Sequence, residues 1–158
     1  MKFLVCVKQV VDTSQMEVDP ATGRLKRNNA NSILNPMDRN ALEAALSLRD
    51  QTGGRVTVIS MGPPQAAAVL KEAGSFDLIF CGMESIDSNT AQIGPEIAAT
   101  LGISDVSAAI GLSYEKEGYV QVERQFGDDR EVLDMKLPGV ITCTGELNKP
   151  RYPSIKGI

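Results

Sequence analysis

The segment Asp77–Gly94, DLIFCGMESIDSNTAQIG, decides the fold of this chain. Its first part, Leu78–Cys81, is a short apolar run typical of a buried strand, and the run ends at Gly82. A polar stretch rich in small side chains follows and leads into the helical pattern of residues 95–101. The segment therefore predicts a buried strand that delivers a polar loop to the start of a helix.

This loop is a candidate ligand site, because open α/β sheets bind ligands beyond the carboxyl ends of their strands. Its polar side chains supply hydrogen-bond donors and acceptors, and Gly94 lets the backbone approach a ligand closely. The polar residues are Asp87, Ser88, Asn89, Thr90 and Gln92. The alternative is that Asn89 or Thr90 only caps the helix and that the other polar side chains face water.

The composition favours one α/β domain. With 158 residues the chain can bury about 68–70% of its unfolded surface, so it needs no disulfide or metal to stabilise a core. Hydrophobic residues make up 42% but aromatic residues only 4%, as in parallel sheets covered by helices on both faces. We expect a single domain over residues 1–147.

Charge and hydropathy exclude several classes of partner. The net charge of −4 and the pI near 4.9 provide no basic stripe for the phosphates of nucleic acid. The apolar run Phe3–Val7 is too short for a signal peptide, and no run approaches the roughly 20 apolar residues of a membrane span. We expect a cytoplasmic protein with no nucleic-acid partner and no stable membrane insertion.

The residue types argue against catalysis. The sequence contains no histidine, the commonest general base and the commonest nitrogen ligand of metals. Cys6, Cys81 and Cys143 lie in apolar runs without the spacing of a zinc site, which favours buried reduced thiols over a redox role. Glu84 and Asp87 could pair for acid–base chemistry but lack a nearby partner in the sequence. We expect no catalytic residue and no metal site.

The N-terminal half has the order of a parallel sheet. Lys2–Lys8 predicts a first strand and Arg55–Met61 a second. Between them, a helix is predicted with Asn35 as its N-cap, Pro36 at its first position and a stop at Gly53. Its core-facing side is expected to hold Leu42, Ala45, Leu46 and Arg49, with Arg39, Glu43 and Asp50 on other sides.

Four further elements complete the pattern. A surface hairpin is predicted within residues 16–29, and a short helix over residues 65–73. Alternating residues on both sides of Gly127–Asp129 predict an antiparallel hairpin, and Val140–Thr144 predicts a buried strand. Residues 148–158 contain two prolines and few apolar anchors, so we expect an arm outside the core.

Three strand ends should meet at one rim of the sheet, namely Cys6–Lys8, Met61–Pro63 and Gly82–Gly94. The helix start at Asn35 faces the same rim and completes a cleft for a nucleotide. Lys8 could attract phosphate there or end its strand in solvent. The glycine-rich motifs GxGxxG and GxxxxGK[ST] are absent, so any phosphate contact must come from these loops.

Six segments in this order resemble the β subunit of electron transfer flavoprotein, the FixA-type family. They are KFLVCVKQVVDT from Lys2, LNPMDRNALEAAL from Leu34, VTVISMGPPQAA from Val56, DLIFCGMESIDSNTAQIGPEIAATLG from Asp77, VERQFGDDREVLDMKLPGVITC from Val122 and NKPRYPSIKGI from Asn148. The forms VCVKQV, NPMD, MGPP and TAQIGPE are similar to those of bacterial, electron-bifurcating members.

The resemblance implies a heterodimer with an electron transfer flavoprotein α subunit that carries most of the site for a redox-active FAD. The β subunit holds AMP in ordinary members and a second FAD in bifurcating ones. The implied nucleotide contacts are Cys6, Asn35, Pro36, Met37, Asp38, Met61, Asp87, Ser88, Asn89, Thr90, Ala91, Gln92, Ile93 and Gly94. Arg151, Tyr152 and Ile155 would lie in the arm that grips partner dehydrogenases, acyl-CoA or other.

The sequence departs from the family in two ways. Many members have Gly and Asp where this chain has Ser88 and Asn89, which puts a contact that needs a carboxylate in doubt. We also expect the chain to lack an internal strand and helix near residue 73 and a C-terminal tail. A different class remains open, a stand-alone adenine-nucleotide sensor similar to universal stress proteins. A small nucleotide-dependent enzyme is a third reading.

Overall fold

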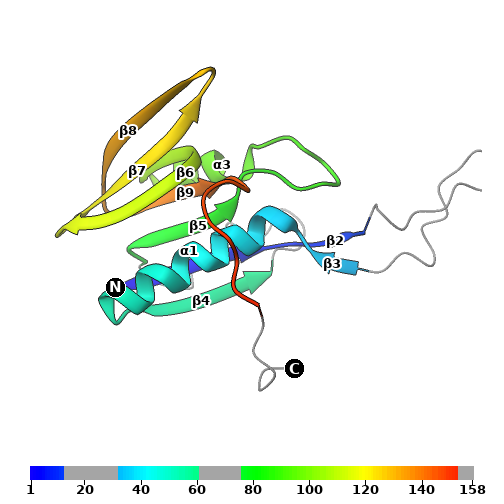
Figure 1. Ribbon diagram of the computed structural model, residues 1–158, viewed down its shortest axis with the longest axis horizontal. Helices are drawn as coiled ribbons and strands as arrows, with labels where there is room; N and C mark the ends of the chain where they lie inside the picture. The colour runs from blue at the N-terminus through cyan, green and yellow to red at the C-terminus, as the bar shows by residue number, and fades with distance from the viewer. Residues whose placement is uncertain (13–31, 61–75, 153–158) are drawn as a thin grey trace, which may run out of the picture.

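The computed structural model describes residues 1–12, 32–60 and 76–152. A seven-stranded sheet runs through it in the order β4-β1-β5-β9-β6-β7-β8 (Figure 1). Its strands are β1 (Lys2–Val7), β4 (Arg55–Ser60), β5 (Leu78–Gly82), β6 (Ser104–Lys116), β7 (Tyr119–Phe126), β8 (Asp129–Lys136) and β9 (Gly139–Cys143). The five strands from β4 to β6 pair in parallel, whereas β7 and β8 pair antiparallel. The predicted mostly parallel α/β sheet with a C-terminal hairpin is confirmed.

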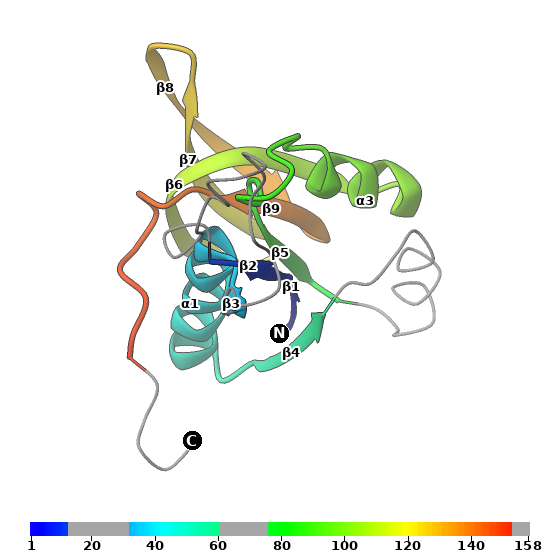
Figure 2. The same cartoon turned by 90° about the vertical axis from the view of Figure 1, so that its right-hand side faces the viewer.

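Among the described residues, one helix lies on each face of the parallel part of the sheet, as Figure 2 shows. Helix α1 (Pro36–Thr52) packs with Phe3 and Val5 of β1, and helix α3 (Ile93–Leu101) packs with Leu4 and Cys6. Successive side chains of a strand point to opposite faces, so a continuous apolar run such as that of β1 requires cover on both sides. The continuous apolar runs in the sequence therefore correctly indicated that both faces of these strands are buried.

The buried side of α1 differs from the predicted one. The residues that pack against the sheet are Ala41, Ala44, Ala45 and Leu48. Leu42, Leu46 and Arg49 are only half-buried. Glu43, expected on another side of the helix, is buried by its contacts with Arg151. Small alanine side chains let α1 lie close to the sheet, and the larger leucines flank this contact. The prediction of the face was right for Ala45 and in part for Leu42, which packs against the core, and wrong for Leu46 and Arg49.

Two parts of the fold have no clear pattern in the sequence. Strand β6 is thirteen residues long, but the run SDVSAAIGLSYEK alternates poorly and contains a register shift between Val106 and Ala109. Ala108 has a positive φ of 61° at this shift, which defines a local bulge. The short strands β2 (Gln9–Val11) and β3 (Ser32–Leu34) form a separate antiparallel pair.

Several predictions fall outside the described residues. The hairpin expected within residues 16–29, the helix expected over 65–73, the rim segment Met61–Pro63 and the arm residue Ile155 all belong to this group. Within the part of the chain that the structure describes, no helix combines the length and the apolar character needed to cross a membrane.

Candidate functional site

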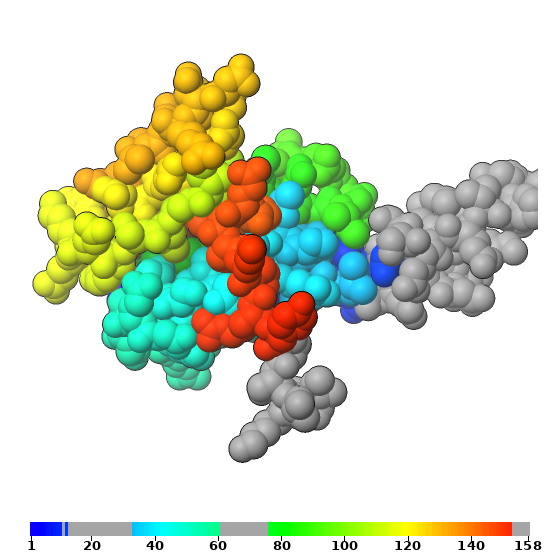
Figure 3. Space-filling view, viewed as in Figure 1, coloured from blue at the N-terminus to red at the C-terminus, as the bar shows by residue number. Residues whose placement is uncertain are grey.

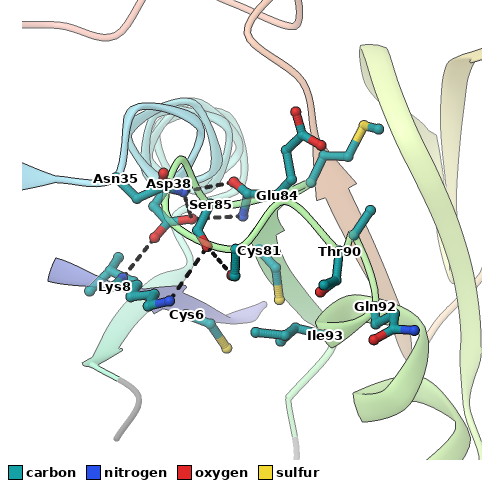
Figure 4. A pocket seen from close by; sticks show the side chains of 15 residues that line it. Cys6, Lys8, Asn35, Asp38, Cys81, Glu84, Ser85, Thr90, Gln92 and Ile93 are labelled. Atoms are coloured by element: carbon teal, nitrogen blue, oxygen red, sulfur yellow. Dashed lines mark hydrogen bonds between the residues drawn. The ribbon is translucent and has the colours of Figure 1, made fainter. Parts of the chain in front are cut away.

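A pocket of about 180 Å³ opens at the carboxyl ends of β1 and β5 (Figure 4). The start of α1, the loop of residues 83–92 and the start of α3 complete its wall. The lining residues are Cys6, Val7, Lys8, Asn35, Asp38, Cys81, Gly82, Met83, Glu84, Ser85, Ser88, Thr90, Ala91, Gln92 and Ile93. The strand-end rule for parallel sheets thus locates the pocket correctly.

The floor of the pocket is apolar. Cys6 and Cys81 are paired in register on β1 and β5, and Ile93 points toward them from the start of α3 (Figure 4). A hydrogen bond with Cys6 raises the pKa of the Cys81 thiol well above its usual range, and burial raises it further. The Cys81 thiol therefore stays protonated at neutral pH, and the floor suits a neutral, flat group.

Asp38 joins three elements behind this floor. Its carboxylate accepts hydrogen bonds from the backbone N–H of Lys8 at 2.7 Å and of Gly82 at 3.1 Å, and from Nδ2 of Asn35 at 3.0 Å. Burial raises the pKa of Asp38, and these hydrogen bonds oppose the rise because they favour the ionised form. The Asp38 carboxylate thus holds the ends of β1 and β5 against α1.

Asn35 does not cap α1 with its side chain, contrary to prediction. It occupies the N-cap position, but its side chain makes no capping hydrogen bond. Its Nδ2 donates to Glu84 O at 2.9 Å as well as to Asp38, and the backbone N–H of Ile86 points at its Oδ1 over 3.4 Å. Asn35 therefore ties the start of α1 to the loop that walls the pocket.

Lys8 holds the same loop from the other side. Its ammonium group donates to Asp87 at 2.8 Å and lies 3.5 Å from the hydroxyl of Ser85. The Ser85 hydroxyl donates to Asp87 at 2.6 Å and shares a 2.7 Å hydrogen bond with Ser88. The bond from Lys8 lowers the pKa of Asp87, so this carboxylate is ionised at neutral pH. Asp87 and Lys8 form an ion pair at the pocket mouth and not an acid–base pair with Glu84.

The middle of the loop has an unusual backbone. Asn89 and Ala91 have positive φ angles of 49° and 54°, a region that costs energy for residues with a side chain. Asn89 tolerates this conformation best, and its amide nitrogen, when turned toward Glu84, donates to both carboxylate oxygens at 2.7 and 2.9 Å. The loop is therefore held in one strained shape by its own polar contacts.

The start of α3 lies at the pocket and has no side-chain cap. Gln92 occupies the N-cap position and makes no side-chain capping hydrogen bond, so neither Asn89 nor Thr90 is the cap. Gly94 does not line the pocket, because it packs against the side chain of Thr142 on β9, where an added Cβ would clash with Cγ2. Its ligand contact stays a prediction.

The structure brings together eight of the predicted contacts: Cys6, Asn35, Asp38, Ser88, Thr90, Ala91, Gln92 and Ile93. Pro36, Met37, Asp87, Asn89 and Gly94 lie nearby without lining the pocket, and Met61 lies outside the described residues. Val7, Lys8 and the segment Cys81–Ser85 line it but were not among the predicted contacts. The sequence could have indicated these residues, because all of them lie at or directly after the carboxyl ends of β1 and β5.

The described residues contain no group of three or more Cys, Asp or Glu side chains placed to hold a metal ion. Arg151 and Tyr152, predicted to bind a partner, lie far along the chain from the pocket. Tyr152 is 95% exposed, whereas Arg151 binds carboxylates of α1.

Comparison with known protein families gives a match to the family described as Electron transfer flavoprotein domain, over residues 22–75 and 66–157. The electron transfer flavoprotein subunit beta of Thermoanaerobacterium thermosaccharolyticum is 40% identical over 192 residues, which cover this whole chain and 74% of the relative. The corresponding subunit of Clostridium acetobutylicum is 38% identical with the same coverage. A caffeyl-CoA reductase-Etf complex subunit of Acetobacterium woodii is 38% identical over 194 residues, again covering this whole chain and 74% of the relative.

These alignments are longer than the chain. They extend over 192 or 194 positions, whereas the chain has 158 residues, so the relatives carry residues that it lacks. The two pieces of the family match overlap at residues 66–75. This overlap is close to residue 73, where the missing strand and helix are expected.

Proposed function

The chain belongs to the electron transfer flavoprotein family, and from this premise we propose that it is a β subunit whose pocket binds the adenosine part of AMP or FAD. Its partner is an α subunit that holds most of the site for a redox-active FAD. The observation that carries the proposal is the pocket formed where β1, β5, α1 and the loop of residues 83–92 meet.

The walls of the pocket fit an adenosine group. The side chains of Cys6, Cys81 and Ile93 form an apolar floor for a flat base. The hydroxyls of Ser88 and Thr90 stand at the wall, where they can bond a ribose or phosphate. The N-terminus of α3 lies beside them without a side-chain cap, and helix N-termini favour anions such as phosphate.

The size of the pocket limits what it encloses. Pockets that bury a whole drug-sized ligand measure roughly 300–1,000 Å³, and this pocket measures about 180 Å³. A volume in this range suits the base with part of its ribose. The remainder of the nucleotide then extends past Thr90 and Gln92 toward the start of α3.

The residues of the chain bind and orient, and the chemistry belongs to the cofactor. A bound FAD supplies the capacity to accept and donate electrons. Asp38 and Asn35 fix the strand ends and the loop, so they set the position of the floor. The cytoplasm is the proposed location. The resemblance to electron-bifurcating members makes a second FAD in the β site the natural alternative to AMP.

The native complex decides between these ligands. The chain is purified with its α subunit without denaturation, and the released ligands are identified by mass spectrometry. One FAD with one AMP per heterodimer indicates an ordinary member, and two FAD indicate a bifurcating one. A colourless homodimer that carries ATP would refute the proposal in favour of the nucleotide sensor similar to universal stress proteins. Steady turnover of a nucleotide by the isolated chain would instead indicate an enzyme.

A variant pair tests the pocket itself. Thr90→Phe places a large ring at the exposed mouth and should reduce the nucleotide content of the purified complex at least tenfold. Thr100→Phe makes the same change at an exposed position on α3 outside the pocket and should retain full content. Equal loss of nucleotide from both variants, or from neither, would place the ligand elsewhere.

A further inference from the structure

The segment of residues 144–152, here called the strap, leaves β9 and crosses the outer side of α1 (Figures 1 and 3). Its start is fixed at Thr144, whose N–H and hydroxyl both donate to Ala109 O, at 3.1 and 2.9 Å. Leu147 is half-buried against the core. Beyond this point the strap has no strand or helix, so side chains must hold it to α1.

The first attachment is a pair of amides. Nδ2 of Asn40 donates to Asn148 O at 2.8 Å and to Asn148 Oδ1 at 3.1 Å. In return, Nδ2 of Asn148 donates to Asn40 O at 3.0 Å. Asn40 is buried by this contact, which fixes the strap one turn after the start of α1.

The second attachment is an ion pair. Nε and Nη2 of Arg151 donate to the two carboxylate oxygens of Glu43, both at 2.8 Å, and the Arg151 backbone N–H adds a bond of 3.1 Å. Nη1 of Arg151 reaches Asp50 at 3.1 Å. Glu43 is only 8% exposed, and the Arg151 bonds are the main reason that its pKa is lowered. A two-pronged contact of this kind fixes both the position and the orientation of the guanidinium.

The attachments lie along one line of α1. Asn40, Glu43, Ser47 and Asp50 follow one another at spacings of three or four residues, and the Ser47 hydroxyl donates to Glu43 at 3.1 Å. A stripe of polar residues on the outer side of a helix ordinarily faces water. Here it is used by the strap, which ends in a fully exposed tyrosine, Tyr152.

We propose that Arg151 acts as a latch inside the chain and not as a contact with a partner. Through Glu43 it sets where Tyr152 stands relative to α1. This inference rests on the proposed function as an electron transfer flavoprotein β subunit, for which the family resemblance implies an arm that binds a flavin-dependent dehydrogenase. It divides the predicted partner-binding residues into a positioning residue, Arg151, and a contact residue, Tyr152.

Hydrogen exchange of the heterodimer tests the latch. The Arg151 amide is bonded to Glu43, so Glu43→Gln should raise exchange in the peptide of residues 148–152 about tenfold. Asp50→Asn, which weakens the latch from an exposed position, should raise it less. Glu146→Gln removes an exposed carboxylate on the strap that is not bonded to Arg151 and should change nothing. Unchanged exchange in both latch variants would overturn the proposal.

Electron transfer from a purified acyl-CoA dehydrogenase tests the positioning role. Arg151→Glu should raise the KM for the heterodimer about tenfold and leave kcat nearly unchanged, because it displaces the strap. Adding Glu43→Arg restores an ion pair of reversed polarity and should bring the KM back to within about threefold. A double variant as impaired as Arg151→Glu would mean that the arginine touches the partner, and would overturn the proposal.

Tyr152→Ala separates this inference from the proposed function. It should raise the KM while hydrogen exchange of the strap stays protected. If neither Tyr152→Ala nor Arg151→Glu changes the KM, the strap has no role in docking and the inference is wrong. The nucleotide site would still be decided independently by the ligands released from the native complex.

Discussion

Nδ2 of Asn35 donates a hydrogen bond to the carbonyl oxygen of Glu84 over 2.9 Å, joining the start of α1 to a loop 49 residues away. Asn35 is 1% exposed, so its amide cannot bond water in place of the Glu84 carbonyl oxygen. The residue stands where a helix cap is expected, yet its amide is used across the fold. The two roles make different predictions for one substitution.

Asn35→Asp separates these roles. Aspartate caps helices as well as asparagine does, so a capping role predicts little change. In the structure aspartate could not donate to Glu84 O, and its carboxylate would face that of Asp38. We expect a loss of about 2–3 kcal/mol in the free energy of unfolding by urea. Asn35→Ala should lose about 2 kcal/mol in the free energy of unfolding. If Asn35→Asp destabilises the chain less than Asn35→Ala does, Asn35 acts as a helix cap after all.

The sequence located α1 correctly but assigned its side chains less well. Pro36 and Gly53 mark the ends of the helix through the backbone conformations that proline and glycine favour. Residue type alone therefore predicts these ends from the sequence. The partners of Asn35 and Glu43 lie 49 and 108 residues away in Glu84 and Arg151. Local patterns contain no information on such pairings, so the burial of Glu43 beneath Arg151 could not be predicted.

Gly82→Ala tests the close approach of β5 to α1. A Cβ at this position would collide with the Asp38 carboxylate and lie 2.9 Å from the Asp38 backbone nitrogen. The backbone cannot yield easily, so we expect a loss of about 1–3 kcal/mol in the free energy of unfolding. Gly145→Ala is the matched control, since its Cβ meets nothing within 4 Å. The control should change stability by less than about 0.5 kcal/mol; equal effects would contradict the packing.

Thr142 makes two contacts, one through its hydroxyl and one through its methyl group, and substitutions can separate them. Its hydroxyl accepts the Ala108 N–H at 3.0 Å in the bulge of β6, and its methyl group packs on Gly94. Thr142→Val removes the acceptor and should cost about 1–2 kcal/mol. Thr142→Ser keeps the acceptor, loses the methyl group and should cost about 0.8 kcal/mol. Thermal and urea unfolding measure both, and a valine variant as stable as the parent would exclude the hydroxyl's role.

The pocket was predictable to the extent that it follows from strand direction. Cys6 and Cys81 meet because parallel strands end at one rim, and this could be inferred from two apolar runs. The roles of Asp38 and Lys8 could not. Asp38 accepts hydrogen bonds from backbone N–H groups, and Lys8 pairs with Asp87. Both contacts depend on how the loop folds back. Residue type alone does not distinguish a ligand contact from a group that holds the wall.

The Arg151–Glu43 pair should make stability depend on pH in a defined window. Bonding to Arg151 lowers the pKa of Glu43 below its ordinary value, so the folded state binds this proton less readily than the unfolded state. The stabilisation is complete above the unfolded pKa of about 4.3 and is lost as pH falls through the lower folded pKa. Glu43→Gln abolishes this term, because glutamine does not titrate.

Urea unfolding at a series of pH values from 7 down to 3 measures the effect. The parent chain should lose stability more steeply than Glu43→Gln below about pH 4.3, since only the parent has the depressed carboxyl. Asp105→Asn removes an exposed carboxylate that takes no part in this pair and should retain the steep parental slope. Added salt should flatten the parental slope only partly, because Glu43 is buried while Arg151 is nearly half-exposed. Parallel pH profiles for the parent and Glu43→Gln would show that the strap is not held by this ion pair in solution.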